Sequence, residues 1–91
     1  MPRILVVDDE PAILSTLRDI LVPFGHEVST AEDGLVGLGR AKAEHFDLVL
    51  SDISMPRMNG IEFLSRLPSI SPGTHRILLT AHTLEEYIDQ L

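Results

Sequence analysis

The sequence lacks cysteine altogether, and Lys42 is its only lysine. Without cysteine the chain can form no disulfide framework and can carry out no thiolate chemistry. Asp and Glu outnumber Lys and Arg by 14 to 7, and the basic residues form no stripe that could follow a phosphate backbone. We therefore expect no direct contact with nucleic acid.

Long hydrophobic runs are also missing, because no apolar stretch approaches the roughly 20 residues that cross a bilayer. The first residues lead straight into an apolar run, without the basic, apolar and small-residue regions of a signal peptide. A length of 91 residues with 44% hydrophobic residues fits one small globular domain. We expect a cytoplasmic protein that makes no contact with a membrane.

Short apolar runs alternate along the chain with segments of helical periodicity. The predicted strands are Ile4–Val7, Glu27–Ala31, Asp47–Ser51 and Arg76–Thr80. The first predicted helix begins near Pro11 and is stopped by Pro23 and Gly25. The others are Leu35–Glu44, Ile61–Leu67, which Pro68 closes, and Thr83–Leu91. A turn of positive φ is predicted at Asn59-Gly60, before the third helix. This alternation predicts an α/β fold with a doubly wound parallel sheet, because right-handed crossovers place helices on both faces.

Three aspartates stand at the ends of two of these strands. Asp8 and Asp9 follow the first strand directly, and Asp52 follows the third. The carboxyl ends of parallel strands meet at one edge of the sheet, where such folds bind their ligands. Three crowded carboxylates repel one another unless a cation or shared protons offset the repulsion. The pattern therefore predicts a site for a hard divalent cation such as Mg²⁺.

A site of this kind suits phosphoryl transfer. Mg²⁺ keeps coordination positions open for phosphoryl oxygens, and a carboxylate beside it can act as a nucleophile and form an aspartyl phosphate. Thr80, at the end of the fourth predicted strand, offers a hydroxyl donor to a phosphoryl oxygen. Each residue also has a simpler interpretation, since acidic residues ahead of Pro11 suit a helix N-terminus and threonine suits a strand. Their convergence at three strand ends favours the functional interpretation.

Taken in order, the motifs resemble a known family. The segments Ile-Leu-Val-Val-Asp-Asp-Glu-Pro at 4–11, Asp-Ile-Ser-Met-Pro at 52–56, Met-Asn-Gly at 58–60 and Leu-Thr-Ala at 79–81 resemble the receiver domain of two-component response regulators. The resemblance covers the whole chain and implies a flavodoxin-like receiver fold. It also implies a signalling domain rather than an enzyme, with slow self-dephosphorylation as its only turnover.

The resemblance assigns a role to each site residue. Asp52 is the expected phosphoacceptor, which takes a phosphoryl group from a histidine kinase or a phosphotransfer protein. Asp9, Asp52 and the main-chain carbonyl of Ser54 would bind Mg²⁺, and Asp8 would hold it mainly through water. Thr80 would move toward the phosphoryl group and couple it to the surface.

Two further implications concern rate and output. In this family the positions of Ser54 and His82 border the phosphoryl pocket and tune how fast water attacks it. The resemblance also allows a C-terminal effector domain that receives the output, and a homodimer. One sequence identifies neither the effector nor the cognate kinase.

One departure from the family pattern is large. The family has a fifth strand and a fifth helix, and the fifth strand carries an aromatic switch residue and ends in a lysine that pairs with the phosphoryl group. The sequence stops at Leu91, before either element, and Lys42 lies inside a predicted helix. We therefore expect residues 1–91 to be a receiver domain that is incomplete at its C-terminus.

Two other functions stay open at this point. A metal-dependent phosphohydrolase would also use an aspartyl phosphate, but such enzymes usually carry Asp-x-Asp after the first strand, whereas Asp8 and Asp9 are adjacent. The other alternative is a receiver-like interaction module that is not controlled by phosphorylation. The absent lysine favours such a module, whereas the intact set of three aspartates and Thr80 argues against it.

Overall fold

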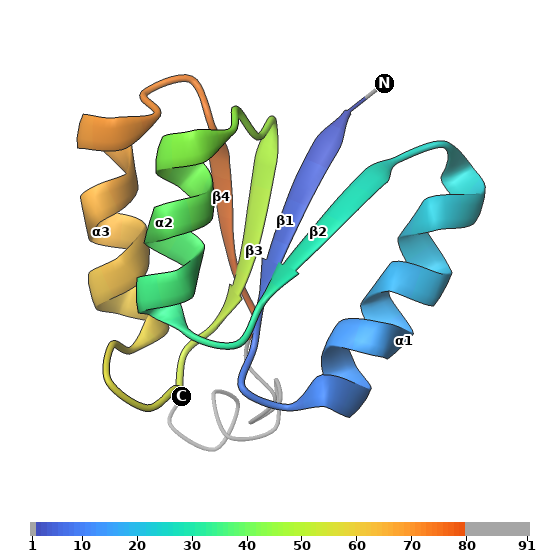
Figure 1. The fold of residues 1–91 in the computed structure, drawn as a ribbon, viewed down its shortest axis with the longest axis horizontal. Helices are drawn as coiled ribbons and strands as arrows, with labels where there is room; N and C mark the ends of the chain where they lie inside the picture. The colour runs from blue at the N-terminus through green and yellow to red at the C-terminus, as the bar shows by residue number, and fades with distance from the viewer. Residues whose placement is uncertain (1, 80–91) are drawn as a thin grey trace, which may run out of the picture.

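Four parallel strands form the centre of the computed structural model, which describes residues 2–79 (Figure 1). The strands are β1 (Arg3–Val7), β2 (Glu27–Ala31), β3 (Leu48–Asp52) and β4 (His75–Leu79), in the spatial order β2-β1-β3-β4. This order is the one that flavodoxin-like folds show over their first four strands. The predicted doubly wound parallel sheet is therefore confirmed.

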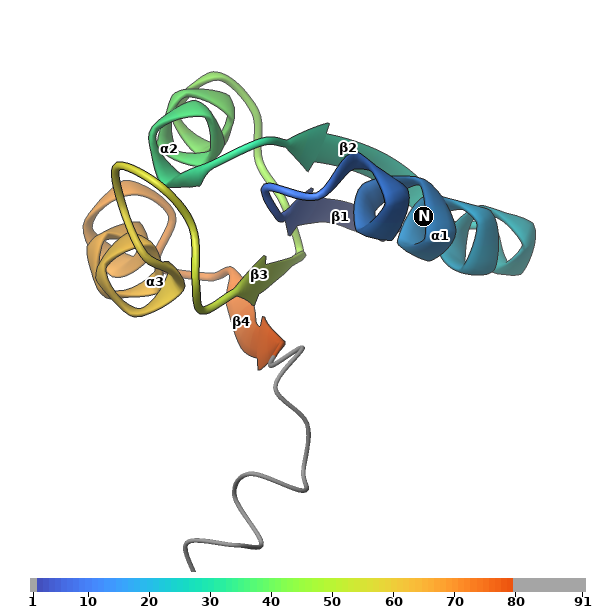
Figure 2. The same cartoon turned by 90° about the horizontal axis from the view of Figure 1, so that it is seen from below.

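Three α-helices connect the strands and cover both faces of the sheet. They are α1 (Pro11–Leu21), α2 (Gly34–Ala43) and α3 (Gly60–Ile70), and a 3-10 turn, η1 (Val22–Phe24), follows α1. Figures 1 and 2 show α2 and α3 together on one face and α1 on the other. Within residues 2–79, no helix is both long and apolar enough to span a bilayer.

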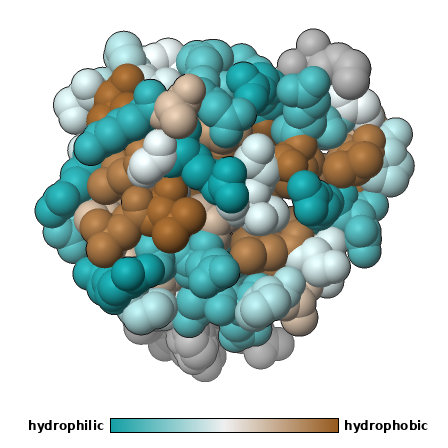
Figure 3. All heavy atoms as spheres, in the orientation of Figure 1, coloured by the Kyte–Doolittle hydropathy of each residue, from teal (hydrophilic) through white to brown (hydrophobic). Residues whose placement is uncertain are grey.

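Two apolar cores lie on the two faces because successive side chains of a strand point in opposite directions. Leu5 and Val7 of β1 belong to the core under α2 and α3, and Ile4 and Val6 belong to the smaller core under α1. The larger core also contains Ala31, Leu38, Ala41, Phe46, Val49, Met58, Phe63 and Leu67. In Figure 3 apolar side chains also reach the surface over α2 and α3, whose exposed large apolar residues are Leu35, Val36 and Ile61.

The third helix is longer than the sequence predicts, because it continues through Pro68 to Ile70. Proline removes the N–H that would bond to the carbonyl four residues earlier, which here is Leu64. The Nη1 of Arg76 donates to this carbonyl at 2.8 Å and so replaces the missing bond. The prediction that Pro68 closes the helix is therefore wrong.

The other boundaries of the strands and helices differ from the predicted ones by at most one residue. The third strand includes Asp52 as its last residue, and α2 begins at Gly34 because Asp33 caps it through the Val36 N–H at 2.9 Å. The predicted helix Thr83–Leu91 and the strand end at Thr80 lie outside the described residues.

Two glycines of α2 have opposite surroundings. A Cβ on Gly37 would lie 2.9 Å from Cε1 of Phe63 and 3.2 Å from Cγ2 of Val7, and both of those side chains are fully buried. A Cβ on Gly39 would meet nothing within 4 Å. Gly37 therefore permits the close packing of α2 on α3 and β1, whereas Gly39 only lowers the helix propensity of α2.

We expect Gly39→Ala to raise the free energy of unfolding by about 0.5–1 kcal/mol, because alanine loses less backbone entropy in a helix. Gly37→Ala makes the same chemical change two residues away and should lower it by roughly 1–2 kcal/mol through overpacking. Urea unfolding followed by circular dichroism measures both. Equal shifts of the same sign would contradict the packing of α2 described here.

Candidate metal centre

The strand register brings the three aspartates to one edge of the sheet. Val7 of β1 pairs with Ser51 of β3, so the residues that follow, Asp8 and Asp52, stand side by side. Asp9 comes next in the connection from β1 to α1. One carboxylate oxygen from each aspartate lies within 4.8 Å of the others. The cluster arises at the C-terminal edge of the sheet, where the sequence places it.

Asp8 is the most buried member of the cluster, with 4% of its surface exposed. Its Oδ1 accepts a hydrogen bond from the Glu10 amide at 2.9 Å. Burial raises the pKa of Asp8 above its ordinary value, and the negative charges of Asp52 and Asp9 raise it further, whereas the Glu10 amide opposes this shift. A cation between the carboxylates would remove the repulsion, and these hard oxygen donors fit Mg²⁺.

Asp52 is the last residue of β3 and is 9% exposed. Its Oδ1 accepts the amide of Ile53 at 2.8 Å, which fixes the orientation of the carboxylate. Its main-chain carbonyl accepts the Ser51 hydroxyl at 3.0 Å. The first of these bonds restricts the carboxylate, and the second holds the backbone of the strand end.

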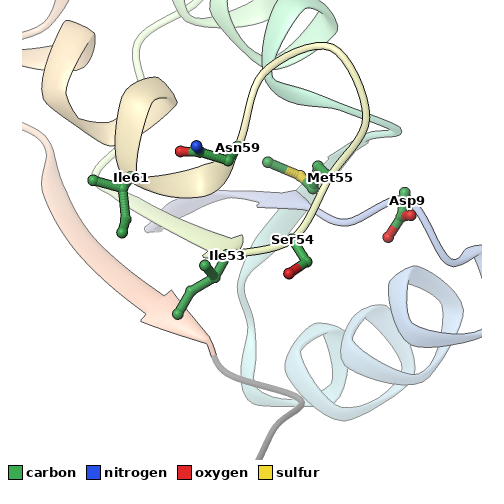
Figure 4. Close-up of a pocket in the computed structure, with 6 residues that line it drawn as sticks. All are labelled: Asp9, Ile53, Ser54, Met55, Asn59 and Ile61. Carbon is green, nitrogen blue, oxygen red and sulfur yellow. The ribbon is translucent and has the colours of Figure 1, made fainter.

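Ser54 lies in the loop that follows Asp52 and lines the same pocket as Asp9. Figure 4 shows Ser54 and Asp9 at the rim of one pocket, which is also lined by Ile53, Met55, Asn59 and Ile61. The pocket opens beside the aspartate cluster, so a ligand that enters it would meet carboxylate oxygens and the backbone of the loop. The role of the Ser54 carbonyl as a metal ligand remains a prediction.

Gly60 closes the base of this loop. Its N–H donates to the Ile53 carbonyl at 2.8 Å, and a Cβ at position 60 would lie 1.9 Å from the main-chain oxygen of Asp52. Only glycine fits so close to the backbone of the strand end. The predicted Asn59-Gly60 turn of positive φ is wrong, because Asn59, with φ −73°, caps α3 by accepting the Glu62 amide at 2.8 Å.

The positive φ in this loop belongs to Arg57, at 67°, and no other non-glycine residue within 2–79 has one. The Arg57 guanidinium forms an ion pair with Asp33 at the start of α2. Sequence reasoning missed this pair, because the partners are 24 residues apart and no local pattern joins them. Two residues that the sequence does single out, Thr80 and His82, lie outside the described residues.

The lysine of this chain does not lie with the three aspartates. Lys42 is in the last turn of α2, and α2 starts at the C-terminal edge of the sheet, so Lys42 lies toward the opposite edge. It is the only lysine in the sequence. The cluster of three aspartates therefore receives no charge compensation from this lysine.

Comparison with known proteins identifies the family. The family described as the response regulator receiver domain matches residues 4–91. The chain is 37% identical over 89 residues to a response regulator receiver protein of Anaeromyxobacter sp. (strain Fw109-5). This match covers 98% of this chain and 37% of that protein. It is 40% identical over 80 residues to the transcriptional regulatory protein GlrR of Escherichia coli (strain K12), covering 88% of this chain and 18% of GlrR. The chain belongs to the response regulator receiver domain family.

Solved structures agree with this assignment. The response regulator TrrA of Thermotoga maritima, in complex with Mg²⁺ and BeF, is 40% identical and superimposes with a TM-score of 0.86, covering 100% of this chain and 77% of that one. TrrA bound to the histidine kinase ThkA gives 41% identity and a TM-score of 0.84 over 91% of this chain and 72% of that one. The chain thus spans well under half of the two curated relatives and about three quarters of these solved chains.

Proposed function

We propose that this receiver domain of two-component signalling accepts a phosphoryl group on Asp52 in a reaction that needs Mg²⁺. The observation that carries the proposal is the meeting of three carboxylates within 4.8 Å at the C-terminal edge of the sheet. Asp52 ends β3 and points its carboxylate into this group. The likeness to TrrA, solved with Mg²⁺ and BeF, supports both the metal and the phosphoryl chemistry.

The three aspartates and the loop after β3 would hold the metal. Asp9, Asp52 and the main-chain carbonyl of Ser54 would bind Mg²⁺ directly, and Asp8 would bind it through water. When bound, Mg²⁺ supplies positive charge that offsets the carboxylates and the phosphoryl oxygens. Asp8 is buried, and one of its carboxylate oxygens lies within 4.8 Å of oxygens of Asp9 and Asp52.

Asp52 is suited to act as the nucleophile. The Ile53 amide donates to its Oδ1, which keeps a second lone pair for Mg²⁺, and Oδ2 would attack phosphorus. In the transfer a new bond forms between this oxygen and phosphorus, and the bond from phosphorus to the donor nitrogen breaks. The donor histidine keeps the electron pair of that bond and takes up a proton. The product is an acyl phosphate on Asp52.

The donor would be a histidine kinase or a phosphotransfer protein, and the complex of TrrA with ThkA supports a kinase. An effector domain that receives the output is supported by the name of GlrR, a transcriptional regulatory protein. A homodimer and the roles of Thr80, Ser54 and His82 stay predictions. The cytoplasmic location also stays a prediction.

Incubation of the full-length protein with acetyl phosphate and Mg²⁺ should add one phosphoryl group per receiver domain, as read by intact mass. Chelation of the metal with EDTA should abolish the labelling, because three carboxylates then repel the phosphoryl donor. Labelling that is unchanged in EDTA would contradict the metal site. Release of many phosphate ions per chain per minute from small phosphate esters would instead favour the phosphohydrolase.

A further inference from the structure

The loop of residues 53–59 carries the Ser54 carbonyl, yet it contains no helix or strand. Its base is closed by the bond from the Gly60 amide to the Ile53 carbonyl. An unsupported loop of this length loses conformational entropy when it orders around a ligand. Contacts that already hold the loop before the metal binds reduce this loss of entropy and so favour metal binding.

The first such contact is the ion pair between Arg57 and Asp33. Asp33 is 3% exposed, and its Oδ1 is held by the Val36 amide at 2.9 Å while its Oδ2 faces the Arg57 guanidinium. The Val36 amide, and then Arg57, hold the pKa of Asp33 below its ordinary value, so the carboxylate is charged at neutral pH. A fixed, buried carboxylate can anchor a mobile arginine in one place.

The second contact joins Met58, which follows Arg57, to Gly34, which follows Asp33. The Met58 side chain is 4% exposed and packs on Gly34, where an added Cβ would lie 3.0 Å from Cβ and Cγ of Met58. Residues 57 and 58 of the loop are thus held against residues 33 and 34. This pair of contacts ties the C-terminal part of the loop to the corner between β2 and α2.

The same corner also touches the other half of the site. The carbonyl of Ala31, the last residue of β2, accepts the Asp8 amide at 3.1 Å. One short stretch of chain, residues 31–34, therefore contacts both the backbone of a site aspartate and the loop that carries Ser54. Movement of the loop relative to the aspartates is restrained through this stretch.

We propose that Arg57 and Asp33 form a positioning pair that preorganises the loop after β3 and thereby increases the affinity of the site for Mg²⁺. The inference rests on the proposed function of the aspartate cluster. Arg57 is a positioning residue, because it acts through the loop and has its ion pair at Asp33 rather than at the cluster.

Global stability does not account for the pair. The Arg57 side chain is 60% exposed, and an ion pair with so exposed a partner adds little to folding stability. The positive φ of Arg57 costs about 1–2 kcal/mol, which is no less than the roughly 0–1 kcal/mol that such a pair contributes. Because the ion pair gains no more free energy than the backbone of Arg57 costs, folding stability does not explain the pair. Its effect on the position of the loop does.

The test is the affinity of the full-length protein for Mg²⁺ alone, measured by isothermal titration calorimetry. Arg57→Gln should weaken Mg²⁺ binding by about 3- to 10-fold, since less of the loop then has the binding conformation. Asp33→Asn should weaken it by a similar factor, because asparagine keeps the helix cap but loses the ion pair. The double variant should be no weaker than either single variant.

Electrostatics alone predicts the opposite sign for Arg57→Gln, because removal of a positive charge favours a bound cation. The matched control is Arg66→Gln, which removes an arginine 52% exposed and paired with Glu62 on the surface of α3. This control should leave the affinity for Mg²⁺ within about twofold of the wild type.

Tighter or unchanged Mg²⁺ binding in Arg57→Gln would overturn the positioning role while leaving the metal site intact. A loss of the same size in Arg66→Gln would overturn it too. Additive losses in the double variant would show that the two residues act separately, which also contradicts the proposal. If the wild type binds no Mg²⁺, the proposed function itself fails, and the positioning role fails with it.

Discussion

Replacement of Asp52 by asparagine should reduce labelling by acetyl phosphate and Mg²⁺ to background. The amide side chain keeps the size of the carboxylate, and its oxygen can still accept the Ile53 amide, but it has no anionic oxygen to attack phosphorus. Folding should survive, because the substitution removes one of three crowded negative charges and so relieves repulsion. Intact-mass measurement after a fixed incubation reads the labelling, and urea unfolding without metal reads the stability.

The matched control for this variant is Asp47→Asn. Asp47 directly precedes β3, so it lies at the opposite end of the same strand, and it is exposed. Its carboxylate accepts the Arg3 amide at 2.8 Å and takes no part in the aspartate cluster. This variant should be labelled like the wild type. Equal labelling of Asp52→Asn and the wild type would remove Asp52 from the reaction.

Gly60→Ala should lower the free energy of unfolding by about 2–3 kcal/mol or more. The new Cβ would lie 1.9 Å from the main-chain oxygen of Asp52, so the end of β3 or the start of α3 must move. Movement of this strand end displaces the carboxylate that we propose as the phosphoacceptor. Chemical denaturation gives the stability, and calorimetry with Mg²⁺ should show weaker binding in whatever fraction stays folded.

Gly73→Ala provides the comparison for this prediction. Gly73 lies in the turn before β4, and a Cβ there would meet nothing within 4 Å. Its effect should stay within about 0.5 kcal/mol, as for other surface substitutions. A Gly60→Ala variant as stable as this control would show that the close approach to Asp52 is not as described.

The sequence predicts the aspartate cluster well, because the position of the cluster follows from two strands and one rule of parallel sheets. Apolar runs ending in Asp8-Asp9 and Asp52 place carboxylates at the C-terminal edge of any parallel sheet. The register of β1 and β3 then sets them side by side. The position of the cluster depends on no long-range contact of a particular side chain, and the family match agrees with the fold and the class of protein that the cluster implies.

The predictions that are wrong or missing depend on contacts between distant residues. Pro68 does not end α3, because Arg76 donates to the carbonyl that the proline leaves without a partner. The turn expected at Asn59-Gly60 is instead a helix cap and a close backbone approach. No spacing or periodicity in a single sequence reveals such partners, and the pair of Arg57 with Asp33 is hidden for the same reason.

The measurement that tests the central claim most directly is the location of the phosphoryl group. Borohydride converts an aspartyl phosphate to homoserine, and trypsin releases residues 43–57, which contain both Asp47 and Asp52. Tandem mass spectrometry should find homoserine at Asp52 alone, with Asp47 in the same peptide and Asp8 and Asp9 in residues 4–18 unchanged. Homoserine at Asp8 or Asp9, or its absence from a labelled protein, would contradict the assignment of Asp52 as the phosphoacceptor.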